Sequence, residues 1–476
     1  MISSDRMAAV DRNTAALGVP RKQLMESSGG AVARQVREMS DPGASVALVC
    51  GRGNNGGDGL VAARFLSDYD VRVFLLGRPT GIRTKIAREN WEALGPADIP
   101  HETVPAGSGL NLDGAEVIVD AMLGTGVTGS LREPEATCAE SINRSEATVL
   151  SVDVPSGVDA DTGKGPETAV DADQIITFHD QKPGHDHIDA SVSVADIGIP
   201  AAAQRFTGPG DLLSLSRDPA GHKGDHGEVL VVGGGPYTGA PALAGQAALR
   251  AGADLVRLAV PAAIANEVQG YDENLIVRPI PGERLSPSHV DRLLELTRAH
   301  DTVLIGPGLG DADATMDAVA SVLNRVDGRV VVDADALSVV PTVDTDAELI
   351  CTPHRGELVA MGGPEVADPR DRTDTLEAYA AELNCTILLK SQTDCVTDGD
   401  RHRLNRTGNP AMTVGGTGDV LAGATAALAC RLDAFQAASV AAYATGRAGD
   451  LTTAGHTRGL LATDLLASLP DALTDD

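Results

Sequence analysis

Short apolar segments that end at a glycine or a polar residue recur along the whole chain, and they limit the possible folds more than any other feature. Residues 45–50, 117–120 and 148–153 are segments of this kind, and a loop rich in glycine and polar side chains follows each one. Strands of a parallel sheet buried on both faces have this composition, and their carboxyl ends carry ligand-binding loops. The sequence therefore predicts an α/β protein built on parallel sheets. Further segments of the same kind are found at 71–76, 228–232, 255–260, 302–305, 330–332, 349–351 and 387–389.

The length of the chain favours two domains. A chain of 476 residues exceeds what one hydrophobic core usually organises. Residues 208–226 are rich in Gly, Pro, Ser and Asp, which is typical of a connection between domains, so we place the boundary within them. The predicted domains are residues 1–214 and 215–476.

The charge of the chain is strongly acidic. Lys and Arg number 38 against 67 Asp and Glu, the net charge is −29, and only six of the basic residues are Lys. Such a surface resembles that of proteins from a high-salt cytoplasm, where dissolved ions screen its self-repulsion. Nothing forms a basic stripe, so nucleic acid is not an expected partner.

The six cysteines form no CxxC pair, and no apolar stretch approaches the ~18 residues of a membrane span. We therefore expect a soluble, cytoplasmic protein with reduced cysteines and no membrane partner.

A glycine-dense stretch near the C-terminus, 408–419, runs into an Ala-rich segment with helical character. Glycines let backbone N–H groups converge, and the helix N-terminus that follows adds unsatisfied donors and the positive end of its dipole. This combination predicts a seat for an anion. Asp419 falls in the first turn of the helix, where it either caps the helix or, if the seat holds a polyphosphate, faces the group being transferred.

A second glycine-rich stretch, 51–59, follows the first apolar segment and is predicted to be a loop that opens a helix from Leu60 to Leu66. Gly51, Gly53 and Gly56 formally match the GxGxxG pattern of dinucleotide-binding turns. The stretch also presents two Asn and one Asp, however, so side-chain oxygens and amides are available as well as backbone groups. A phosphate clasp combined with a cation ligand fits better than a Rossmann turn; an ordinary strand-to-helix turn is the alternative.

Three segment ends in the N-terminal half deliver polar side chains to one place. They are the stretch Asn54–Asp58, Asp120 with the loop that follows it, and Asp153. Because the carboxyl ends of parallel strands share one edge of an open sheet, these groups are expected to line one crevice.

The C-terminal half resembles the ADP-dependent NAD(P)H-hydrate dehydratases, through the motifs at 306–310 (GPGLG), 352–357 (TPHRGE) and 415–419 (GGTGD). The resemblance implies a ribokinase-like α/β/α domain that binds ADP with Mg²⁺. Two departures from the family pattern are Arg355, where Pro is usual, and Ser391, where Gly is commoner. By resemblance, the hydrated nicotinamide site comprises Ala240, Gly308, His354 and Asp419, the last as catalytic base, and the nucleotide site comprises Lys390, Ser391, Gln392, Thr393, Asp394 and Gly418.

The N-terminal half resembles the NAD(P)H-hydrate epimerase domain, through the motifs at 53–59 (GNNGGDG) and 152–159 (VDVPSGVD). The resemblance implies a Rossmann-like three-layer α/β/α sandwich with Asp153 as a catalytic residue. It also implies a K⁺ ion held by Asn55, Asp120 and Ser156. The segment 25–29, in the predicted N-terminal helix, departs from the family pattern. By resemblance, the substrate-binding residues are Asn54, Asn55, Gly56, Gly57, Asp58, Gly124, Thr125, Gly126, Val127, Thr128, Gly129, Ser130 and Asp153.

Together these resemblances imply a bifunctional repair enzyme. It would epimerise the R and S forms of hydrated NADH and NADPH, dehydrate the S form at the expense of ADP, and form a homo-oligomer. The alternative is a ribokinase-like small-molecule kinase, of the hydroxyethylthiazole or hydroxymethylpyrimidine type, with a non-catalytic dinucleotide-binding N-terminal domain. The TPH motif at 352–354 and the fused first domain argue against that alternative.

Overall fold

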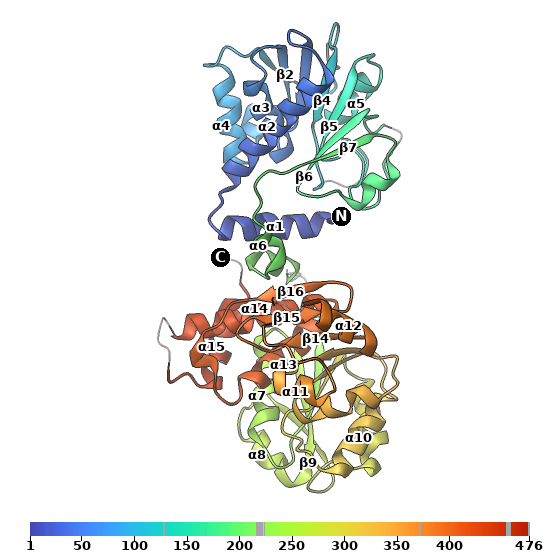
Figure 1. The fold of residues 1–476 in the computed structure, drawn as a ribbon, viewed down its shortest axis with the longest axis vertical. Helices are drawn as coiled ribbons and strands as arrows, with labels where there is room; N and C mark the ends of the chain where they lie inside the picture. The colour runs from blue at the N-terminus through green and yellow to red at the C-terminus, as the bar shows by residue number, and fades with distance from the viewer. Residues whose placement is uncertain are drawn as a thin grey trace. The chain divides into compact units, whose positions relative to one another are not determined.

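The chain folds into two compact units, Met1–Ala203 and Gln204–Asp476, which carry the blue-to-green and green-to-red parts of the ribbon in Figure 1. The structure is a computed structural model that describes residues 1–476 except 127, 128, 167, 216–221, 223, 369, 371, 372, 454–457, 475 and 476. A short helix, α6 (Ala201–Arg205), contains the division between the two units. The domain limits 1–214 and 215–476 stay a prediction.

The first unit is built on a seven-stranded parallel sheet with the order β3-β2-β1-β4-β5-β6-β7. The chain moves outward in one direction from β1 to β3 and then crosses to the other side of β1 for β4 to β7, as in Rossmann-like folds. The strands are β1 (Ser45–Cys50), β2 (Asp70–Leu76), β3 (His101–Val104), β4 (Val117–Ala121), β5 (Thr148–Val152), β6 (Gln174–Phe178) and β7 (Ser191–Ala195).

Helices cover both faces of this sheet, so the unit has three layers. Val46 and Leu48 of β1 join a buried cluster with α2 and α3, whereas the alternate residues Ala47 and Val49 join a second cluster with α5. This alternation follows from the two-residue period of a strand, and it explains why β1 is apolar throughout. The helices are α1 (Ser4–Ala16), α2 (Arg21–Met39), α3 (Asn54–Phe65), α4 (Lys85–Leu94) and α5 (Glu135–Asn143).

The start of α3 corrects one sequence-based expectation. Helix α3 begins at Asn54 and not at Leu60, so most of the expected loop forms its first turns. The glycines are needed there for close packing: a Cβ on Gly56 would lie 2.0 Å from the Gly51 carbonyl oxygen, and a Cβ on Gly59 would lie 2.8 Å from Cys50 Sγ. Glycine can therefore favour a helix where the helix must approach a strand end closely, which the loop interpretation overlooked.

The second unit is built on a nine-stranded sheet with the order β10-β9-β8-β11-β12-β13-β14-β15-β16. Strands β8 to β14 are parallel, and β15 and β16 extend the sheet as an antiparallel pair. The strands are β8 (Glu228–Val232), β9 (Leu255–Pro261), β10 (Ile276–Ile280), β11 (Thr302–Ile305), β12 (Arg329–Val332), β13 (Glu348–Cys351), β14 (Cys385–Leu389), β15 (Asp394–Thr397) and β16 (His402–Asn405).

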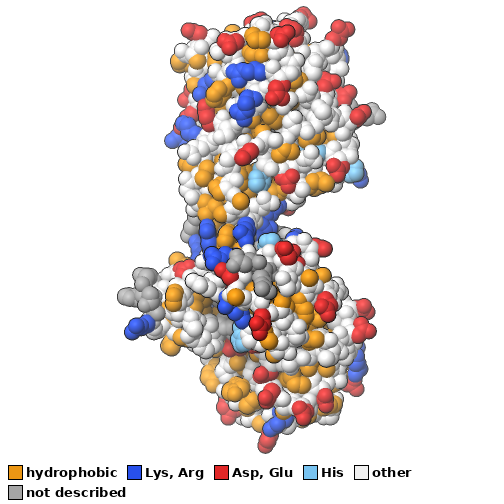
Figure 2. Space-filling model, viewed as in Figure 1, with side chains coloured by type: hydrophobic (Ala, Val, Ile, Leu, Met, Phe, Trp, Pro, Cys, Tyr) orange, Lys and Arg blue, Asp and Glu red, His pale blue; other side chains and the backbone are white. Residues whose placement is uncertain are grey.

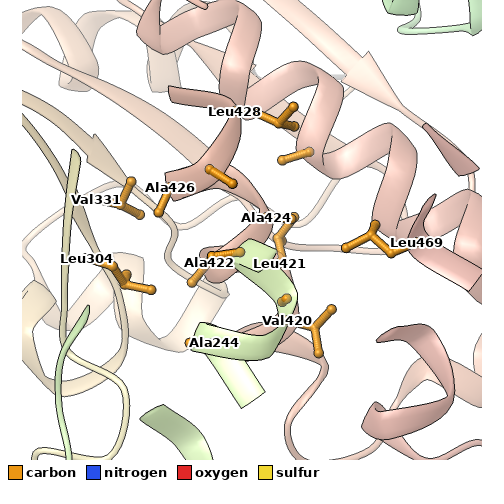
Figure 3. Close-up of a cluster of buried hydrophobic side chains, with 14 of the residues drawn as sticks. Ala244, Leu304, Val331, Val420, Leu421, Ala422, Ala424, Ala426, Leu428 and Leu469 are labelled. Carbon is orange, nitrogen blue, oxygen red and sulfur yellow. The ribbon is translucent and has the colours of Figure 1, made fainter. Parts of the chain in front are cut away.

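Helix α13 (Thr417–Ala429) is central to this unit, because every residue from Val420 to Ala429 is buried. In Figure 3 its side chains lie between strand residues such as Leu304 and Val331 and the neighbouring helices. A Cβ on Gly423 would lie 2.0 Å from the carbonyl oxygen of Ala244, so α13 and α7 pack backbone to backbone. The helices are α7 (Gly239–Arg250), α8 (Ala265–Gln269), α9 (Val290–Thr297), α10 (Asp313–Leu323), α11 (Arg355–Ala360), α12 (Thr373–Leu383), α13, α14 (Ala434–Thr453) and α15 (Ala462–Ala472).

The surface carries the acidity that the composition indicates. Acidic side chains are spread over the visible face of both units in Figure 2 and are not confined to one segment. Among the described helices, none is both long and apolar enough to cross a membrane.

Candidate active sites

The candidate site of the first unit lies at the carboxyl ends of β1, β4 and β5. The strand order reverses between β1 and β4, and in open α/β sheets the crevice at such a reversal is where ligands bind. Helix α3 begins just after β1 at this edge, and the segments that follow β4 and β5 begin here too.

Asp120, near the carboxyl end of β4, is the most enclosed acidic group of this site. Its carboxylate is fully buried and accepts four hydrogen bonds: from Ser156 Oγ (2.6 Å), Ser156 N (2.8 Å), Ser151 Oγ (2.9 Å) and Met122 N (3.2 Å). Burial raises the pKa of Asp120, and these hydrogen bonds counteract part of that rise. Asp120 and Ser156, two of the three residues predicted to hold K⁺, are thus in direct contact.

Asn55, the third predicted K⁺ ligand, lies beside the same strand end. Its Nδ2 donates to the Leu123 carbonyl oxygen at 3.0 Å, and Ser156 Oγ lies 3.4 Å from that same carbonyl oxygen. A Cβ on Gly124 would come within 3.3 Å of Asn55 Oδ1, so the amide oxygen faces the start of the Gly124 loop. Carboxylate, hydroxyl, amide and carbonyl oxygens therefore meet in one place.

Asp153, the predicted catalytic residue, is held in an unusual backbone conformation. Its φ is 71°, a region that side chains other than glycine rarely occupy, and such strain persists only where the surroundings enforce it. Asp153 N donates to the Ile176 carbonyl oxygen at 2.7 Å, and His185 Nε2 donates to the Asp153 carbonyl oxygen at 2.8 Å. The backbone is thus fixed on both sides of the side chain.

A buried lysine pairs with the Asp153 carboxylate. Lys182, only 1% exposed, places Nζ 3.0 Å from Asp153 Oδ1 and 2.9 Å from Thr177 Oγ1. Thr177 Oγ1 donates to the same carboxylate oxygen at 3.0 Å. Both contacts therefore involve the same carboxylate oxygen, Oδ1.

Two further carboxyl groups belong to this site electrostatically. Burial raises the pKa of Asp58 well above its usual range, and the charges of Asp153 and Asp11 raise it further. Burial also raises the pKa of Asp11, in α1, to about 6, against the lowering effect of Arg21. Asp11 was not predicted from the sequence, because nothing in its local pattern separates it from an ordinary acidic helix residue.

The candidate site of the second unit is centred on the start of α13. Gly416 has φ 94°, which reverses the chain just before the helix, and the first helical hydrogen bond runs from Val420 N to the Gly416 carbonyl oxygen at 3.1 Å. The N–H groups of Thr417, Gly418 and Asp419 precede that bond and point out of the helix N-terminus. Burial, together with the charges of Asp333 and Glu357, raises the pKa of Asp419 to about 7, against the lowering effect of Lys390.

Lys390, at the end of β14, extends toward this turn. A Cβ on Gly418 would lie 3.5 Å from Lys390 Nζ, so the ammonium group lies against the first turn of α13. Nζ is 2.9 Å from Asp333 Oδ1 and 3.6 Å from Glu357 Oε2. The structure thus brings Lys390 and Gly418, two predicted nucleotide-binding residues, together with the predicted base.

The predicted hydrated-nicotinamide residues come from three loops. Gly308, with φ 73°, and Ala240 are neighbours: a Cβ on Gly308 would lie 3.3 Å from Ala240 Cβ and 2.9 Å from the Tyr237 carbonyl oxygen. His354 caps the start of α11 by accepting from Glu357 N at 3.0 Å, and His354 N donates to Glu357 Oε2 at 2.6 Å.

The remaining nucleotide-binding candidates form the loop between β14 and β15. Ser391 N donates to Asp394 Oδ1 at 2.9 Å, and Asn405 Nδ2 donates to Asp394 Oδ2 at 3.0 Å. Burial raises the pKa of Asp394 to about 6. Gln392 and Thr393 lie at the tip of the loop. The two departures from the family pattern contact each other, since Arg355 Nη2 donates to Ser391 Oγ at 2.9 Å.

Comparison with known proteins identifies the family. The sequence profile described as NAD(P)H-hydrate dehydratase matches residues 229–471, and that of the YjeF-related protein N-terminus matches residues 21–184. The bifunctional NAD(P)H-hydrate repair enzyme Nnr of Methanothermobacter thermautotrophicus is 43% identical, over 98% of this chain and 94% of its own length. The enzyme of the same name from Archaeoglobus fulgidus is 44% identical, over 99% of this chain and 98% of its own length.

The chain belongs to the family of bifunctional NAD(P)H-hydrate repair enzymes. It combines an N-terminal epimerase domain with a C-terminal dehydratase domain. The second unit also resembles a crystal structure of a ribokinase-like superfamily protein from Enterococcus faecalis, with a TM-score of 0.51 and 23% identity over 56% of this chain and 95% of the other. The predicted family, the two-domain α/β fold and the ribokinase-like second domain are confirmed.

The roles of individual residues in this repair enzyme remain predictions, but most of the chosen residues do converge. Val127 and Thr128, predicted to bind substrate, lie outside the described residues. Gly126, Gly129 and Ser130 lie in the connection from β4 to α5. The sequence analysis assigned no site role to Asp11, Thr177, Lys182, Asp333 or Glu357, which the structure brings beside the candidate residues; Asp333 follows an apolar segment directly, as Asp153 does, and could have been chosen by that rule.

Proposed function

We propose that the dehydratase domain uses ADP with Mg²⁺ to phosphorylate the hydroxyl group of the S form of hydrated NADH or NADPH. The observation that carries this proposal is the position of Asp419, a partly buried carboxyl with a pKa of about 7, in the first turn of a helix whose start lies against Lys390 Nζ. A base with a pKa near neutrality can take the hydroxyl proton while the helix N-terminus holds a phosphate group.

Phosphorylation solves the chemical problem of the dehydration. Hydration of the nicotinamide ring places a hydroxyl on C6, and hydroxide is a poor leaving group. Transfer of the β-phosphoryl group of ADP to that oxygen releases AMP; loss of a proton from C5 and expulsion of phosphate then restore the C5–C6 double bond. Each N–H donor of Gly415 to Gly418 that binds the transferring phosphoryl group contributes up to ~3 kcal/mol to the transition state.

The other predicted residues divide into two groups. Ala240, Gly308 and His354 bind the hydrated nicotinamide, and the loop Lys390–Asp394 with Gly418 binds the nucleotide. The contact between Ala240 and Gly308, and that between Lys390 and Gly418, support these groups. Phosphoryl transfer from ADP to a bound hydroxyl requires the two groups of residues to meet at Asp419, which Gly418 directly precedes.

The charges around Lys390 support a role for Mg²⁺. One ammonium group lies among three carboxyl groups, those of Asp333, Glu357 and Asp419. A polyphosphate that entered alone would be repelled, whereas Mg²⁺ bound by the ADP phosphates neutralises most of the ligand's charge. The nucleotide is therefore expected to bind as its magnesium complex.

The absorbance of NADH at 340 nm tests this proposal directly. Purified protein is incubated with hydrated NADH and Mg²⁺, together with ADP, ATP or no nucleotide. Recovery should require a nucleotide, should be faster with ADP, should form AMP in equal amount, and should stop when EDTA removes Mg²⁺. Equal or faster recovery with ATP alone would reverse the assignment of ADP as the donor.

For the epimerase domain, we propose that Asp153 delivers a proton to the C6 hydroxyl group and so starts the inversion of configuration at C6. This carbon carries both the ring nitrogen and the hydroxyl group, so protonation lets the nitrogen lone pair expel water, which then adds again from the other face. Lys182 and Thr177 hold Asp153 Oδ1, and Oδ2 acts on the hydroxyl group. Asn54, Gly56, Gly57 and Asp58 in the first turns of α3, and the loop 124–130, bind the dinucleotide.

The donor set beside Asp153 fits K⁺, a hard cation that prefers oxygen ligands. Asn55 Oδ1, the Asp120 carboxylate, Ser156 Oγ and the Leu123 carbonyl oxygen supply a single negative charge and several neutral oxygens. K⁺ bound there would hold the start of α3 to the end of β4 and to the segment after β5, and would provide a positive charge beside the substrate.

Epimerisation should therefore depend on K⁺. The rate at which one pure epimer converts is measured in K⁺-free buffer and during titration with KCl at constant ionic strength. We expect the rate to rise with K⁺, and a Ser156→Ala variant to need a higher K⁺ concentration. A rate that does not respond to K⁺ would remove the ion from the proposal. A homo-oligomeric state and a cytoplasmic location stay predictions.

A further inference from the structure

Lys390 is held by side chains from two other elements. Its Nζ contacts Asp333 Oδ1 at 2.9 Å, at the end of β12, and Glu357 Oε2 at 3.6 Å, in α11. Lys390 N also donates to the Pro353 carbonyl oxygen at 2.8 Å, which fixes the backbone from which the side chain extends. A lysine side chain with four rotatable bonds is normally mobile, so this arrangement confines the ammonium group to one place.

The two carboxylates are themselves fixed. Asp333 is 2% exposed and accepts from Thr352 Oγ1 at 2.7 Å, and Thr352 is completely buried. Glu357 is fixed by the reciprocal cap with His354 at the start of α11. A Cβ on Gly306 would lie 1.8 Å from the Asp333 carbonyl oxygen, so the chain just after β11 packs directly against the backbone of Asp333. Both carboxylates are therefore held by partners other than Lys390.

The ammonium group is fixed where charge changes during the proposed reaction. It lies against Gly418, beside the N–H groups of the first turn of α13, which share the same anion seat. Burial alone would lower the pKa of Lys390, but Asp333 and Glu357 raise it, so the group stays charged. A fixed cation needs no reorganisation when a phosphoryl group arrives, which is the main requirement of electrostatic catalysis.

The same carboxylates act on the proposed base. Asp333 and Glu357 raise the pKa of Asp419 and Lys390 lowers it, so the basicity of Asp419 depends on all three groups. The other charged or titratable groups beside them are His354 and Arg355 of α11 and Asp394 of the loop after β14. Asp333 therefore has two effects: it places the cation, and it strengthens the base.

We propose that Asp333, supported by Glu357, is a positioning residue that holds the Lys390 ammonium group against Gly418, as the fixed cation for the phosphoryl group and the counter-charge of Asp419. The inference rests on the proposed phosphoryl transfer and adds two residues to it. In this role Asp333 acts through Lys390 and Asp419.

The pH dependence of kcat/KM for ADP-dependent dehydration tests this role. Removing the charge of Asp333 and removing the charge of Lys390 should shift the acid limb of the profile in opposite directions. Asp333→Asn keeps the shape and the hydrogen-bond acceptor but removes a negative charge, so the acid limb should move to lower pH by at least about half a unit. Lys390→Met removes the positive charge, so the acid limb should move to higher pH. Asp333→Asn should also lower kcat by about tenfold or more, because the cation is no longer fixed.

Two further variants complete the test. Asp291→Asn removes the carboxylate of an exposed ion pair with Arg325, 2.9 Å long, and should leave the profile unchanged. Glu357→Gln retains the helix cap and should shift the acid limb in the same direction as Asp333→Asn, so the test stands even if the buried Asp333 variant folds poorly. An acid limb that does not move in Asp333→Asn and Glu357→Gln, or that moves the same way in these and in Lys390→Met, would overturn the inference. Loss of ADP dependence in the unmodified enzyme would instead overturn the proposed function.

Discussion

Asp419→Asn keeps the size of the side chain and removes its capacity to take a proton. General-base catalysis by a positioned group contributes ~10²–10⁴-fold, so dehydration should fall by at least ~10²-fold. The affinity for ADP should be retained, because the carboxyl group is placed at the reacting hydroxyl and not at the nucleotide. The epimerase activity of the same chain should be unchanged, and it provides an internal control for concentration and folding of the first unit.

The environment of Asp419 gives this prediction a definite pH dependence. Burial, with help from Asp333 and Glu357, raises its pKa to about 7. About 90% of the carboxyl groups are then ionised at pH 8 and about 10% at pH 6. The kcat/KM of the unmodified enzyme should therefore fall by about tenfold between pH 8 and pH 6. The asparagine variant has no base to titrate, so its profile should be flat and its deficit should shrink by the same factor.

Initial rates at 340 nm with the pure S form of hydrated NADH and saturating Mg·ADP, measured at half-unit steps from pH 6 to pH 8.5, provide the comparison. ADP affinity is measured separately by calorimetry. Near-normal turnover of the variant would show that Asp419 only caps α13. A deficit of constant size at every pH would show that the acid limb belongs to another group.

The buried Lys182 and the helix contact at Gly423 give two further predictions. Lys182→Met leaves the Asp153 carboxylate without its counter-charge, and removing one partner of a buried ion pair costs ~3–5 kcal/mol. Urea denaturation should therefore show a less stable first unit. Epimerisation should be lost, while dehydration persists. Gly423→Ala places a Cβ 2.0 Å from the Ala244 carbonyl oxygen and should lower the free energy of unfolding of the second unit by ~1–3 kcal/mol, whereas Gly239→Ala, where no atom lies within 4 Å, should have little effect; equal stability of the two would contradict the close packing of α7 and α13.

The central strands were predictable because they are buried on both faces. β1, β4, β5, β8, β11 and β12 all come from apolar segments that the sequence shows directly. Two sheet edges were not found: β3 (His101–Val104) buries only Val104, and β10 (Ile276–Ile280) contains a proline and buries only Ile280. The interior strand β6 (Gln174–Phe178), buried at all positions but the first, was missed as well. An edge strand has less neighbouring structure to cover it, so its sequence lacks the continuous apolar pattern.

Among the candidate site residues, too, those at the ends of central strands could be chosen from the sequence, whereas their partners from other segments could not. Residues that end a central strand, such as Asp120 and Asp153, were found because the strand fixes where they lie. Their partners were not, because Lys182 reaches Asp153 from a segment beyond β6, and Asp11 reaches the site from α1. Such pairs depend on how separate loops meet in three dimensions, which local sequence pattern does not specify. The motif gave Asn54 and Asn55 as candidate site residues, which stays a prediction, but the helix that carries them was expected to begin only at Leu60.

The central claim is that one chain carries two separate sites, and a progress curve of Asp153→Ala tests it most directly. The variant is supplied with a mixture of both epimers of hydrated NADH, Mg²⁺ and ADP, and the absorbance at 340 nm is followed to completion. We expect a fast phase, in which the intact dehydratase consumes the S form, and then a slow phase limited by spontaneous epimerisation of the R form, where the unmodified enzyme shows a single phase. A single unchanged phase would mean that Asp153 does not carry the epimerisation, and loss of the fast phase would mean that the two units share one active site.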